Sequence, residues 1–251
     1  MTVIDINADL GEGFGVWRLG DDLELLGVVT SANVACGFHA GDPLIMRRTC
    51  DAAVSRGVAI GAQVSYRDLA GFGRREMDVA PEELTAEVLY QLSALDGIAR
   101  VCGGRVGYVK PHGALYNRIV RDPVQAAAVV AAVSAYDPSL PILTLPGSAV
   151  YDAAGDLTVV AECYADRAYT AAGALVSRRE SGAVIHDPTE VAFRAVRMAV
   201  DKIVISIDGT KVPVGARSIC VHGDTPGAVE IAQAVRTALT GAGVTLSPFT
   251  A

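Results

Sequence analysis

Short apolar runs alternate with helical patterns about seven times along this 251-residue chain, and that alternation constrains the fold more than any other feature. Strands that alternate with helices favour a parallel sheet with right-handed crossovers. We therefore predict an α/β fold, with a barrel of about seven or eight strands as the first choice and a doubly wound open sheet as the alternative. The strands are expected at residues 3–6, up to 35, 58–62, 106–109, 142–145, 157–161 and 218–221. The helices are expected at residues 22–26, 43–56, 81–102, 123–135, 188–200 and from Pro226 onward.

Two segments interrupt this alternation. Asp208 and Gly209 lie between apolar runs at 203–207 and 212–214, which predicts a β-hairpin. The segment 168–185 has no clear period and is expected to be an irregular loop. Because no linker and no repeat of fixed period divides the chain, we expect a single domain over residues 1–251.

Charge and composition argue against several kinds of partner. The formal net charge is −7 and no stripe of Lys or Arg is present, which disfavours binding to nucleic acid or to an anionic membrane. No run of about 18 apolar residues occurs and the N-terminus shows no signal peptide, so a cytoplasmic protein is expected. The five cysteines form no CxxC pair, which is typical of reduced thiols in a cytosolic enzyme.

The first expected strand ends in polar residues that are costly to bury. The stretch VIDINADLGEGFG at 3–15 delivers Asn7, Asp9 and Glu12 within six residues. Buried carboxylates need partners, and the carboxyl ends of parallel strands are where α/β enzymes build their sites. Asp9 and Glu12 are therefore candidates for a general base or a metal ligand. The alternative is that one of them pairs with an arginine and caps the next helix.

Three of the four histidines follow three different expected strands. His39 follows the second strand, His112 the fourth and His222 the last, whereas His186 stands beside a helix start and is expected to be structural. Histidine exchanges protons near neutral pH, so this arrangement suits general acid–base hydrolysis or a metal site. No HExxH or other tight metal spacing is present, and no metal ligand is assigned.

Other reactive or charged residues have two explanations each. Lys110 either binds a carboxylate or another anion inside the barrel or is a solvated residue beyond its strand. Asp42 and Asp224 each precede a helix start, where N-capping alone would explain them. Cys36 and Cys220 could act as nucleophiles but are better explained as core residues. The arginines that could bind an anionic substrate are Arg74, Arg75, Arg167, Arg178 and Arg179.

Six stretches of the sequence resemble, in order, the LamB/YcsF family, whose members are described as the A subunit of 5-oxoprolinase. They cover the chain from end to end and read DINADLGEGFG (5–15), ANVACGFHAGDP (32–43), SYRDLAGFGRR (65–75), VKPHGALYN (109–117), ECYADRAY (162–169) and CVHGDTP (220–226). The resemblance implies a distorted, seven-stranded β/α barrel of the glycoside hydrolase/deacetylase type. It also implies ATP-dependent hydrolysis of 5-oxo-L-proline to L-glutamate, with ATP as cosubstrate and with two partner subunits, B and C.

The residues at the strand ends and this resemblance together give a candidate site. The expected catalytic residues are Asp9, Glu12, His39, Lys110 and His112. The expected substrate-binding residues are Asn7, Asn33, Asp42, Arg75, Tyr116, Asp166, Arg167, His222 and Asp224. A five-membered lactam is unreactive, so phosphorylation of its amide oxygen would make it a better electrophile for water, with Asp9, His39 or His112 as the base. Lys110 and the arginines would hold the substrate carboxylate or stabilise developing negative charge.

One position departs from the family pattern. Where the family commonly has GAHPSY, this chain reads GAQVSY at 61–66. Gln63 is a poor metal ligand and carries no exchangeable acid–base proton, so a metal site or mechanism that requires an imidazole there is not expected, and the use of a divalent metal stays open. The alternative functions are a metal-dependent carbohydrate deacetylase and a binding or regulatory subunit without catalysis. The sequence is also compatible with a homo-oligomer.

Overall fold

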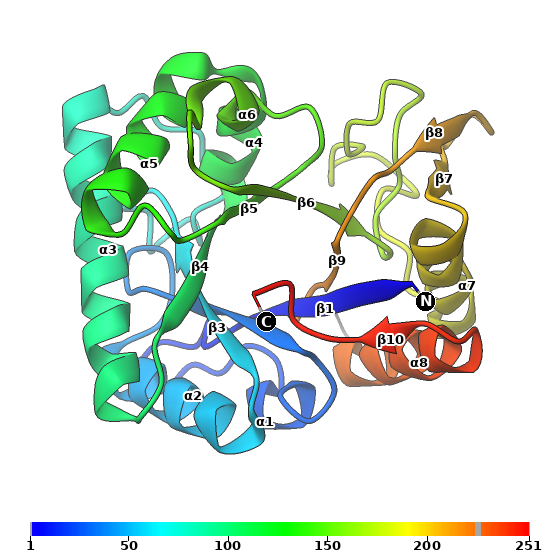
Figure 1. Ribbon diagram of the computed structural model, residues 1–251, viewed down its shortest axis with the longest axis horizontal. Coiled ribbons are helices and arrows are strands. Elements are labelled where there is room, and N and C mark those ends of the chain that lie inside the picture. Colours follow the sequence, from blue (N-terminus) through cyan, green and yellow to red (C-terminus); the bar gives the residue numbers. More distant parts are fainter. Residues whose placement is uncertain (1, 224–226, 251) are drawn as a thin grey trace.

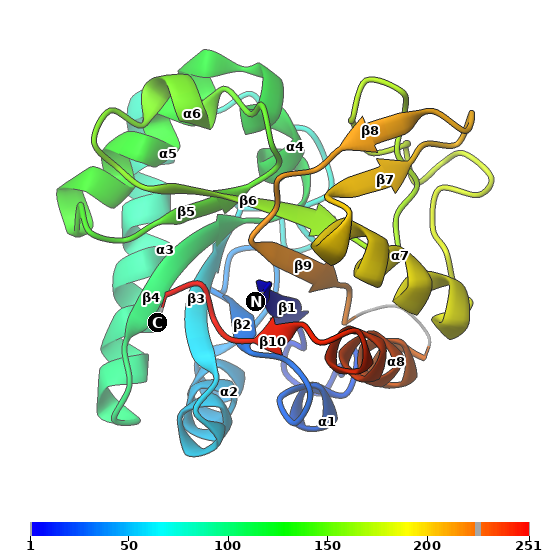
Figure 2. The ribbon, with the colours of Figure 1, turned by 45° about the vertical axis from the view of Figure 1, so that its right-hand side comes forward.

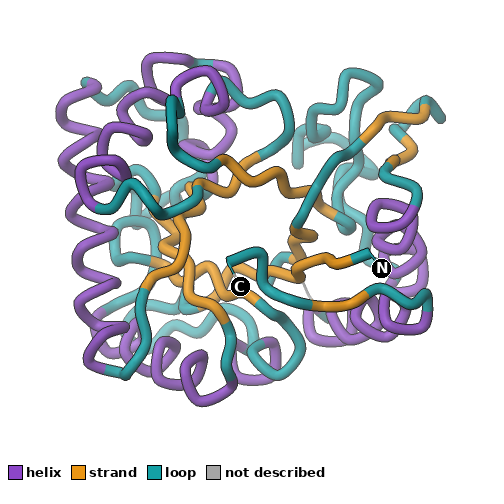
Figure 3. Tube along the Cα trace, in the orientation of Figure 1, coloured by secondary structure: helices purple, strands orange, loops and turns teal. Residues whose placement is uncertain are grey.

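Seven parallel strands close into a barrel, with helices around the outside (Figures 1 and 3). The computed structural model describes residues 2–223 and 227–250. In spatial order the barrel strands are β1 (Val3–Leu10), β2 (Ser31–Ala35), β3 (Ala59–Val64), β4 (Val106–Pro111), β5 (Ile142–Thr144), β6 (Val159–Tyr164) and β9 (Ser218–Val221). Because β9 pairs in parallel with both β6 and β1, the ring is closed. The predicted seven-stranded barrel is confirmed, and the open doubly wound alternative is wrong.

Three short strands lie outside this ring. The strands β7 (Ile203–Ile205) and β8 (Lys211–Pro213) form an antiparallel hairpin beside α7 (Pro188–Val200), which confirms the predicted turn (Figure 2). The strand β10 (Thr245–Leu246) pairs with the first residues of β1 and was not predicted. The barrel is irregular at β5, which shares with β4 only the pair Val109 and Ile142.

The helices begin largely where capping signals predict. They are α1 (Asp22–Leu25), α2 (Pro43–Arg56), α3 (Pro81–Val101), α4 (Gly113–Arg121), α5 (Pro123–Tyr136), α6 (Val150–Ala153), α7 and α8 (Ala228–Gly241). Asp42, Asp122 and Asp187 each accept two backbone N–H bonds at a helix start, with proline at the next position. The helices α4 and α6 were not predicted, and Pro226 lies outside the described residues. Within the described ranges, no helix is both long and apolar enough to cross a membrane.

The barrel strands separate apolar and polar side chains by alternation. On β1, Ile4, Ile6, Ala8 and Leu10 are buried in the main hydrophobic cluster, together with residues of the surrounding helices. The intervening residues of β1 are Asp5, Asn7 and Asp9, which are also buried. Successive side chains of a strand point to opposite faces of a sheet, so the polar set faces the inside of the barrel. The interior of this barrel is therefore largely polar and requires hydrogen-bond partners.

An apolar floor closes the barrel at the end where the strands begin. Tyr108, Leu143, Val160 and Phe249 form a separate buried cluster, in which the rings of Tyr108 and Phe249 lie 4.9 Å apart. The Tyr108 ring packs against the backbone of Gly61, its partner in the β3–β4 ladder. Gly61 is therefore required as a close-packing glycine, because a side chain there would enter the aromatic ring.

Replacing Gly61 with alanine is expected to destabilise the protein strongly. The added Cβ would lie 2.2 Å from two Tyr108 ring atoms, so the floor must shift, at a cost of about 1–3 kcal/mol. Urea denaturation of the variant measures this loss. Gly97→Ala is the matched control, because Gly97 lies within α3 with open space around its Cβ position; it should be neutral or stabilising by about 0.5–1 kcal/mol. Equal stabilities for the two variants would contradict the packing argument.

Candidate active site

The lowest polar layer inside the barrel is centred on Asp5. Its carboxylate accepts hydrogen bonds from the hydroxyls of Thr30 at 2.5 Å and Ser31 at 2.7 Å, and from the hydroxyl of Ser218. The Ser218 oxygen also accepts a bond of 2.7 Å from the side-chain amide of Asn7. Burial raises the pKa of Asp5 to about 6, although the three hydroxyl donors oppose that shift.

This raised pKa predicts a specific pH dependence of stability. Between the unfolded value of 3.8 and about 6, the folded protein retains a proton on Asp5 that the unfolded chain has released. The contribution of Asp5 to the free energy of unfolding should therefore fall as pH rises through this window, by up to about 1.4 kcal/mol per pH unit, and it is measured as the difference between wild type and a variant without this carboxyl. Denaturation of wild type and Asp5→Asn at pH 4 and pH 7 checks this, because the variant lacks the contribution. Asp156→Asn, at an exposed position, should retain the wild-type dependence.

The next layer is a buried ammonium group surrounded by acceptors. Lys110 on β4 is 2% exposed, and its Nζ lies 3.0 Å from Glu162 Oε2 on β6 and 3.3 Å from Asp9 Oδ1 on β1. It also donates to Asn7 Oδ1 at 3.0 Å and lies 3.1 Å from Cys220 Sγ. Burial lowers the pKa of Lys110, but the surrounding negative charge outweighs burial and raises that pKa well above its usual value. Lys110 is therefore a charged interior residue and not a solvated one.

Asp9 is the carboxylate that links this layer to the barrel rim. Its Oδ1 accepts a hydrogen bond of 2.8 Å from the side-chain amide of Asn33. The Asn33 Oδ1 in turn accepts a hydrogen bond of 2.6 Å from the Tyr108 hydroxyl. Burial raises the pKa of Asp9, but the nearby charge of Lys110 and the smaller effects of His112 and His222 bring it well below the usual value. Asp9 is 7% exposed. It is thus an ionised carboxylate at the carboxyl ends of the strands.

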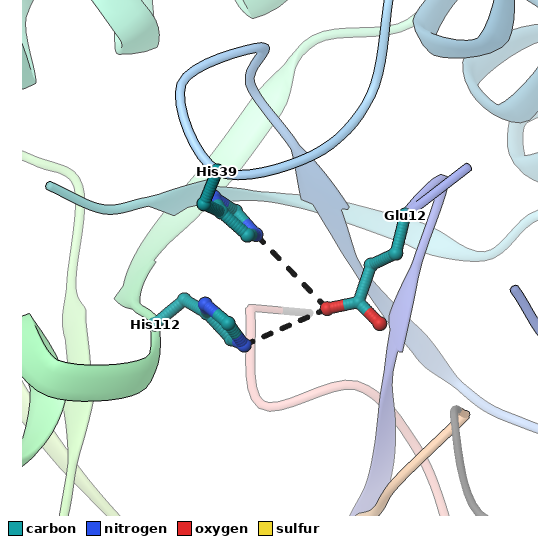
Figure 4. A group of neighbouring side chains, drawn as sticks. All are labelled: Glu12, His39 and His112. Atoms are coloured by element: carbon teal, nitrogen blue, oxygen red, sulfur yellow. Dashed lines mark ion pairs between the residues drawn. The ribbon is translucent and has the colours of Figure 1, made fainter. Parts of the chain in front are cut away.

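Glu12, His39 and His112 converge at the same rim from the ends of β1, β2 and β4 (Figure 4). The Nε2 atoms of His39 and His112 lie 4.0 and 3.7 Å from the same oxygen of Glu12. The two imidazole rings are stacked with their centroids 4.2 Å apart. Burial lowers the pKa of His39 to about 4 and that of His112 well below its usual value, so both rings are neutral at pH 7.

The loop after β3 covers this pair of histidines. Phe72 contacts both rings edge-on, with centroids 5.9 Å from His39 and 5.3 Å from His112. Its φ of +55° is unusual for a residue with a side chain, and the Arg74 guanidinium lies 4.9 Å above its ring. Asp68 accepts bonds from the backbone N–H groups of Gly71 and Arg75, which stabilises this conformation. The loop therefore holds an aromatic ring over the two imidazoles.

A third histidine lies across the rim from the first pair. His222, after β9, has its Nδ1 2.7 Å from Asp166 Oδ2, after β6. Burial raises the pKa of Asp166, but His222 outweighs burial and keeps that pKa below its usual value. The Tyr164 ring stacks on His222 at 5.2 Å and lies 5.2 Å from Lys110 Nζ. Tyr164 therefore connects this dyad to the buried lysine.

Comparison with known proteins identifies the family of this chain. The family model described as LamB/YcsF family matches residues 4–251. The chain belongs to the LamB/YcsF family. A curated relative from Mycobacterium marinum is named as the A subunit of 5-oxoprolinase and is 60% identical over 251 residues, which is 99% of this chain and all of the relative.

Two solved structures extend the comparison. A lactam utilization protein from Thermus thermophilus is 44% identical and superposes with a TM-score of 0.94, over 98% of this chain and all of that one. A polysaccharide deacetylase from Bacillus cereus superposes with a TM-score of 0.54 at 10% identity, over 99% of this chain and 92% of that one. The second likeness shows the fold alone. The predicted resemblance to the LamB/YcsF family and to the deacetylase barrels is confirmed.

Most of the site residues predicted for this LamB/YcsF chain lie inside the barrel or at the rim formed by the carboxyl ends of its strands. The residues that share contacts there are Asn7, Asp9, Glu12, Asn33, His39, Lys110, His112, Asp166 and His222. Tyr116 on α4 joins them through its ring, which lies edge-on to Tyr164 at 6.0 Å. Two surface hollows of about 390 and 490 Å³ are lined by other residues, around Arg236 and between α3 and α5. These predicted residues thus converge, and neither hollow lies among them.

Three predicted substrate-binding residues lie elsewhere or have other partners. Asp42 caps α2 and also accepts a bond of 2.8 Å from the Gly15 N–H, which fits its structural explanation. Arg75 pairs with Asp68, and its side chain is 66% exposed. Arg167 donates to the backbone carbonyls of residues 176 and 183, so it organises the long loop at 168–185. Asp224 lies outside the described residues.

Glu162 is the main site residue that the sequence reasoning missed. The strand containing it was expected at 157–161, whereas β6 runs from Val159 to Tyr164. Glu162 was therefore placed beyond the strand and was not assigned a role. Alternation of Val160, Glu162 and Tyr164 on the inner face was the signal that would have found it.

Proposed function

We propose that this chain is the A subunit of a 5-oxoprolinase, which with partner subunits B and C opens 5-oxo-L-proline to L-glutamate in an ATP-dependent reaction. The full-length likeness to relatives of that name supports the assignment. The observation that carries the chemistry is the ionised carboxylate of Asp9, held by buried Lys110 beside two neutral imidazoles at the barrel rim. Because the reaction consumes ATP, we assign the protein to the cytoplasm.

The lactam must be activated before it can be hydrolysed. ATP would transfer a phosphoryl group to the amide oxygen, which releases ADP and makes the ring carbon more electrophilic. Water would then add to that carbon, and cleavage of the C–N bond would give an acyl phosphate with a free amine. A second water would release phosphate and leave glutamate. We assign phosphorylation to the partner subunits, because this sequence has no GxGxxG or GKS/GKT element.

The rim provides groups for the hydrolytic steps. Asp9 has one oxygen fixed by Asn33 and Lys110 and would accept the proton of the attacking water. His222, oriented by Asp166, would supply a proton to the departing ring nitrogen. Lys110 is surrounded by Asp9, Glu162 and Asn7, so it would act by positioning Asp9 and not by binding the substrate carboxylate.

The test is glutamate formation from 5-oxoproline by the purified chain, alone and reconstituted with subunits B and C, with and without ATP. We expect turnover only when all three subunits and ATP are present. Release of acetate from N-acetylated sugars without ATP would instead identify a deacetylase. Undiminished turnover by subunits B and C in the absence of this chain would refute the catalytic role.

A further inference from the structure

We infer that Glu12, His39 and His112 form a binding site for one divalent first-row transition-metal ion. This site goes beyond the proposed lactam hydrolysis and does not depend on it. The family commonly has a histidine at position 63, where this chain has Gln63, and the site proposed here requires no ligand from that position.

The potential ligand atoms of the three side chains are close enough together to surround one metal ion. Among the described residues, Glu12, His39 and His112 form a group of three potential metal ligands in which each side chain offers one ligand atom. These three atoms all lie within 4.8 Å of one another (Figure 4). Both histidine Nε2 atoms approach a single oxygen of Glu12, at 4.0 and 3.7 Å, which is too long for hydrogen bonds. Ligands of a tetrahedral ion with bonds of about 2.1 Å lie roughly 3.4 Å apart. The distances from Glu12 to the two Nε2 atoms exceed this value by about 0.6 and 0.3 Å, and all three ligand atoms lie within 4.8 Å of one another, so side-chain movements would allow all three to bind one ion.

The donor types also suit a transition metal. Two neutral imidazoles and one carboxylate are the three-ligand set that leaves a fourth position open for water or substrate. Magnesium prefers oxygen ligands and suits this set poorly. All three residues are nearly buried, with exposures of 1% for His39, 4% for Glu12 and 7% for His112. An ion here would lower the pKa of a bound water at the same rim as Asp9.

Gln63 makes a hydrogen bond that positions the Glu12 ligand. Its amide nitrogen donates a hydrogen bond of 3.0 Å to Glu12 Oε1, which orients that carboxylate. Its amide oxygen lies 3.2 Å from His39 Nε2, and a bound ion would replace this contact. Residues that orient metal ligands in this way change metal affinity about 10–100-fold when they are removed. The glutamine would thus support the site from the position where the family commonly has histidine.

Two features indicate that the ion exchanges readily. The Nδ1 atoms of His39 and His112, which would carry the protons when Nε2 binds metal, have no hydrogen-bond partner within the described ranges. Tightly bound ions usually have that second nitrogen hydrogen-bonded. The positive charges of Arg74 and Lys110 also act on His112. We therefore expect an ion that dialysis against a chelator removes.

The experiment is a calorimetric titration of the chelator-treated full chain with Zn²⁺, and separately with Mg²⁺, followed by thermal unfolding with each ion. We expect one Zn²⁺ per chain, a higher Tm with Zn²⁺, and no comparable effect of Mg²⁺. Glu12→Gln, His39→Gln and His112→Gln should each weaken Zn²⁺ binding at least 10-fold. His186→Gln, at a histidine outside this cluster, should bind as wild type does.

A second variant and a second probe guard against misfolding and against binding by thiols. Gln63→Ala retains all three ligands and should weaken Zn²⁺ binding about 10–100-fold. Co²⁺ bound at this site should show ligand-field bands without a thiolate charge-transfer band. No stoichiometric Zn²⁺ binding, or binding unchanged in all three ligand variants, would overturn the site. Because these measurements need neither lactam nor partner subunits, their failure is distinguishable from failure of the proposed hydrolysis.

Discussion

Replacing Asp9 with asparagine is expected to lower turnover of the reconstituted complex about 10²–10⁴-fold, the range lost when a general base is removed. The amide still offers an oxygen to Asn33 and Lys110, so the local hydrogen bonds remain, but it cannot accept a proton from water. Lys110 also retains the carboxylate of Glu162, which limits the loss of stability. Steady-state glutamate formation with saturating ATP and 5-oxoproline measures the effect.

The control for this prediction is Asp156→Asn, which removes an exposed carboxylate and should leave turnover unchanged. The Tm of each variant, measured in the same buffer, separates a chemical defect from unfolding. If Asp9→Asn binds 5-oxoproline and the complex turns over at the wild-type rate, Asp9 is not the base, and a purely binding role for this chain becomes the better explanation.

Lys110→Met should produce the largest loss of stability among the site variants. It leaves the carboxylates of Asp9 and Glu162 buried without the cation between them, and breaking a buried ion pair from one side costs about 3–5 kcal/mol. For a chain of this size, that corresponds to a decrease in Tm of roughly 6–20 °C. Loss of the ammonium also raises the pKa of Asp9, so the remaining activity should shift toward higher pH. Thermal unfolding and a pH–rate profile measure the two effects.

A double substitution tests the electrostatic cause directly. Lys110→Met combined with Glu162→Gln removes one of the two uncompensated charges and should recover part of the lost stability. Lys211→Met, at an exposed lysine in β8, removes a positive charge without burying a negative one and should have the wild-type Tm. A Lys110→Met protein as stable as wild type would contradict the buried ion-pair arrangement.

Local signals were sufficient for much of the fold. Asp42, Asp122 and Asp187 each stand before a proline and mark helix starts that the structure contains. These signals work because they act over two or three residues. The helix α4 was missed because it follows β4 almost directly, with His112 both ending the polar motif and occupying the N-cap position.

The site was less accessible from sequence, because its contacts join distant strands. The position of the polar residues after successive strands was enough to bring Asp9, His39 and His112 together. The sequence did not identify which residues pair with a buried charge. Lys110 was expected to bind a carboxylate or another anion, and the structure places it beside Asp9 and Glu162. Arg167 was expected to bind substrate, but its partners are the backbone carbonyls of residues 176 and 183. Any residue type supplies a backbone carbonyl, so the sequence gives no signal for this contact.

Closure of the ring between β1 and β9 has a consequence for biosynthesis. The hydrogen bond from Asn7 to Ser218 joins residues separated by 211 positions. A ribosome that adds about 5–20 residues per second needs on the order of 10–40 s between these two residues. During that interval the nascent first strand exposes Asp5, Asn7 and Asp9 without their last partners. The carboxylate of Asp9, to which we assign the role of base, therefore acquires its final environment only near the end of translation, which makes this strand a point where holding chaperones could act.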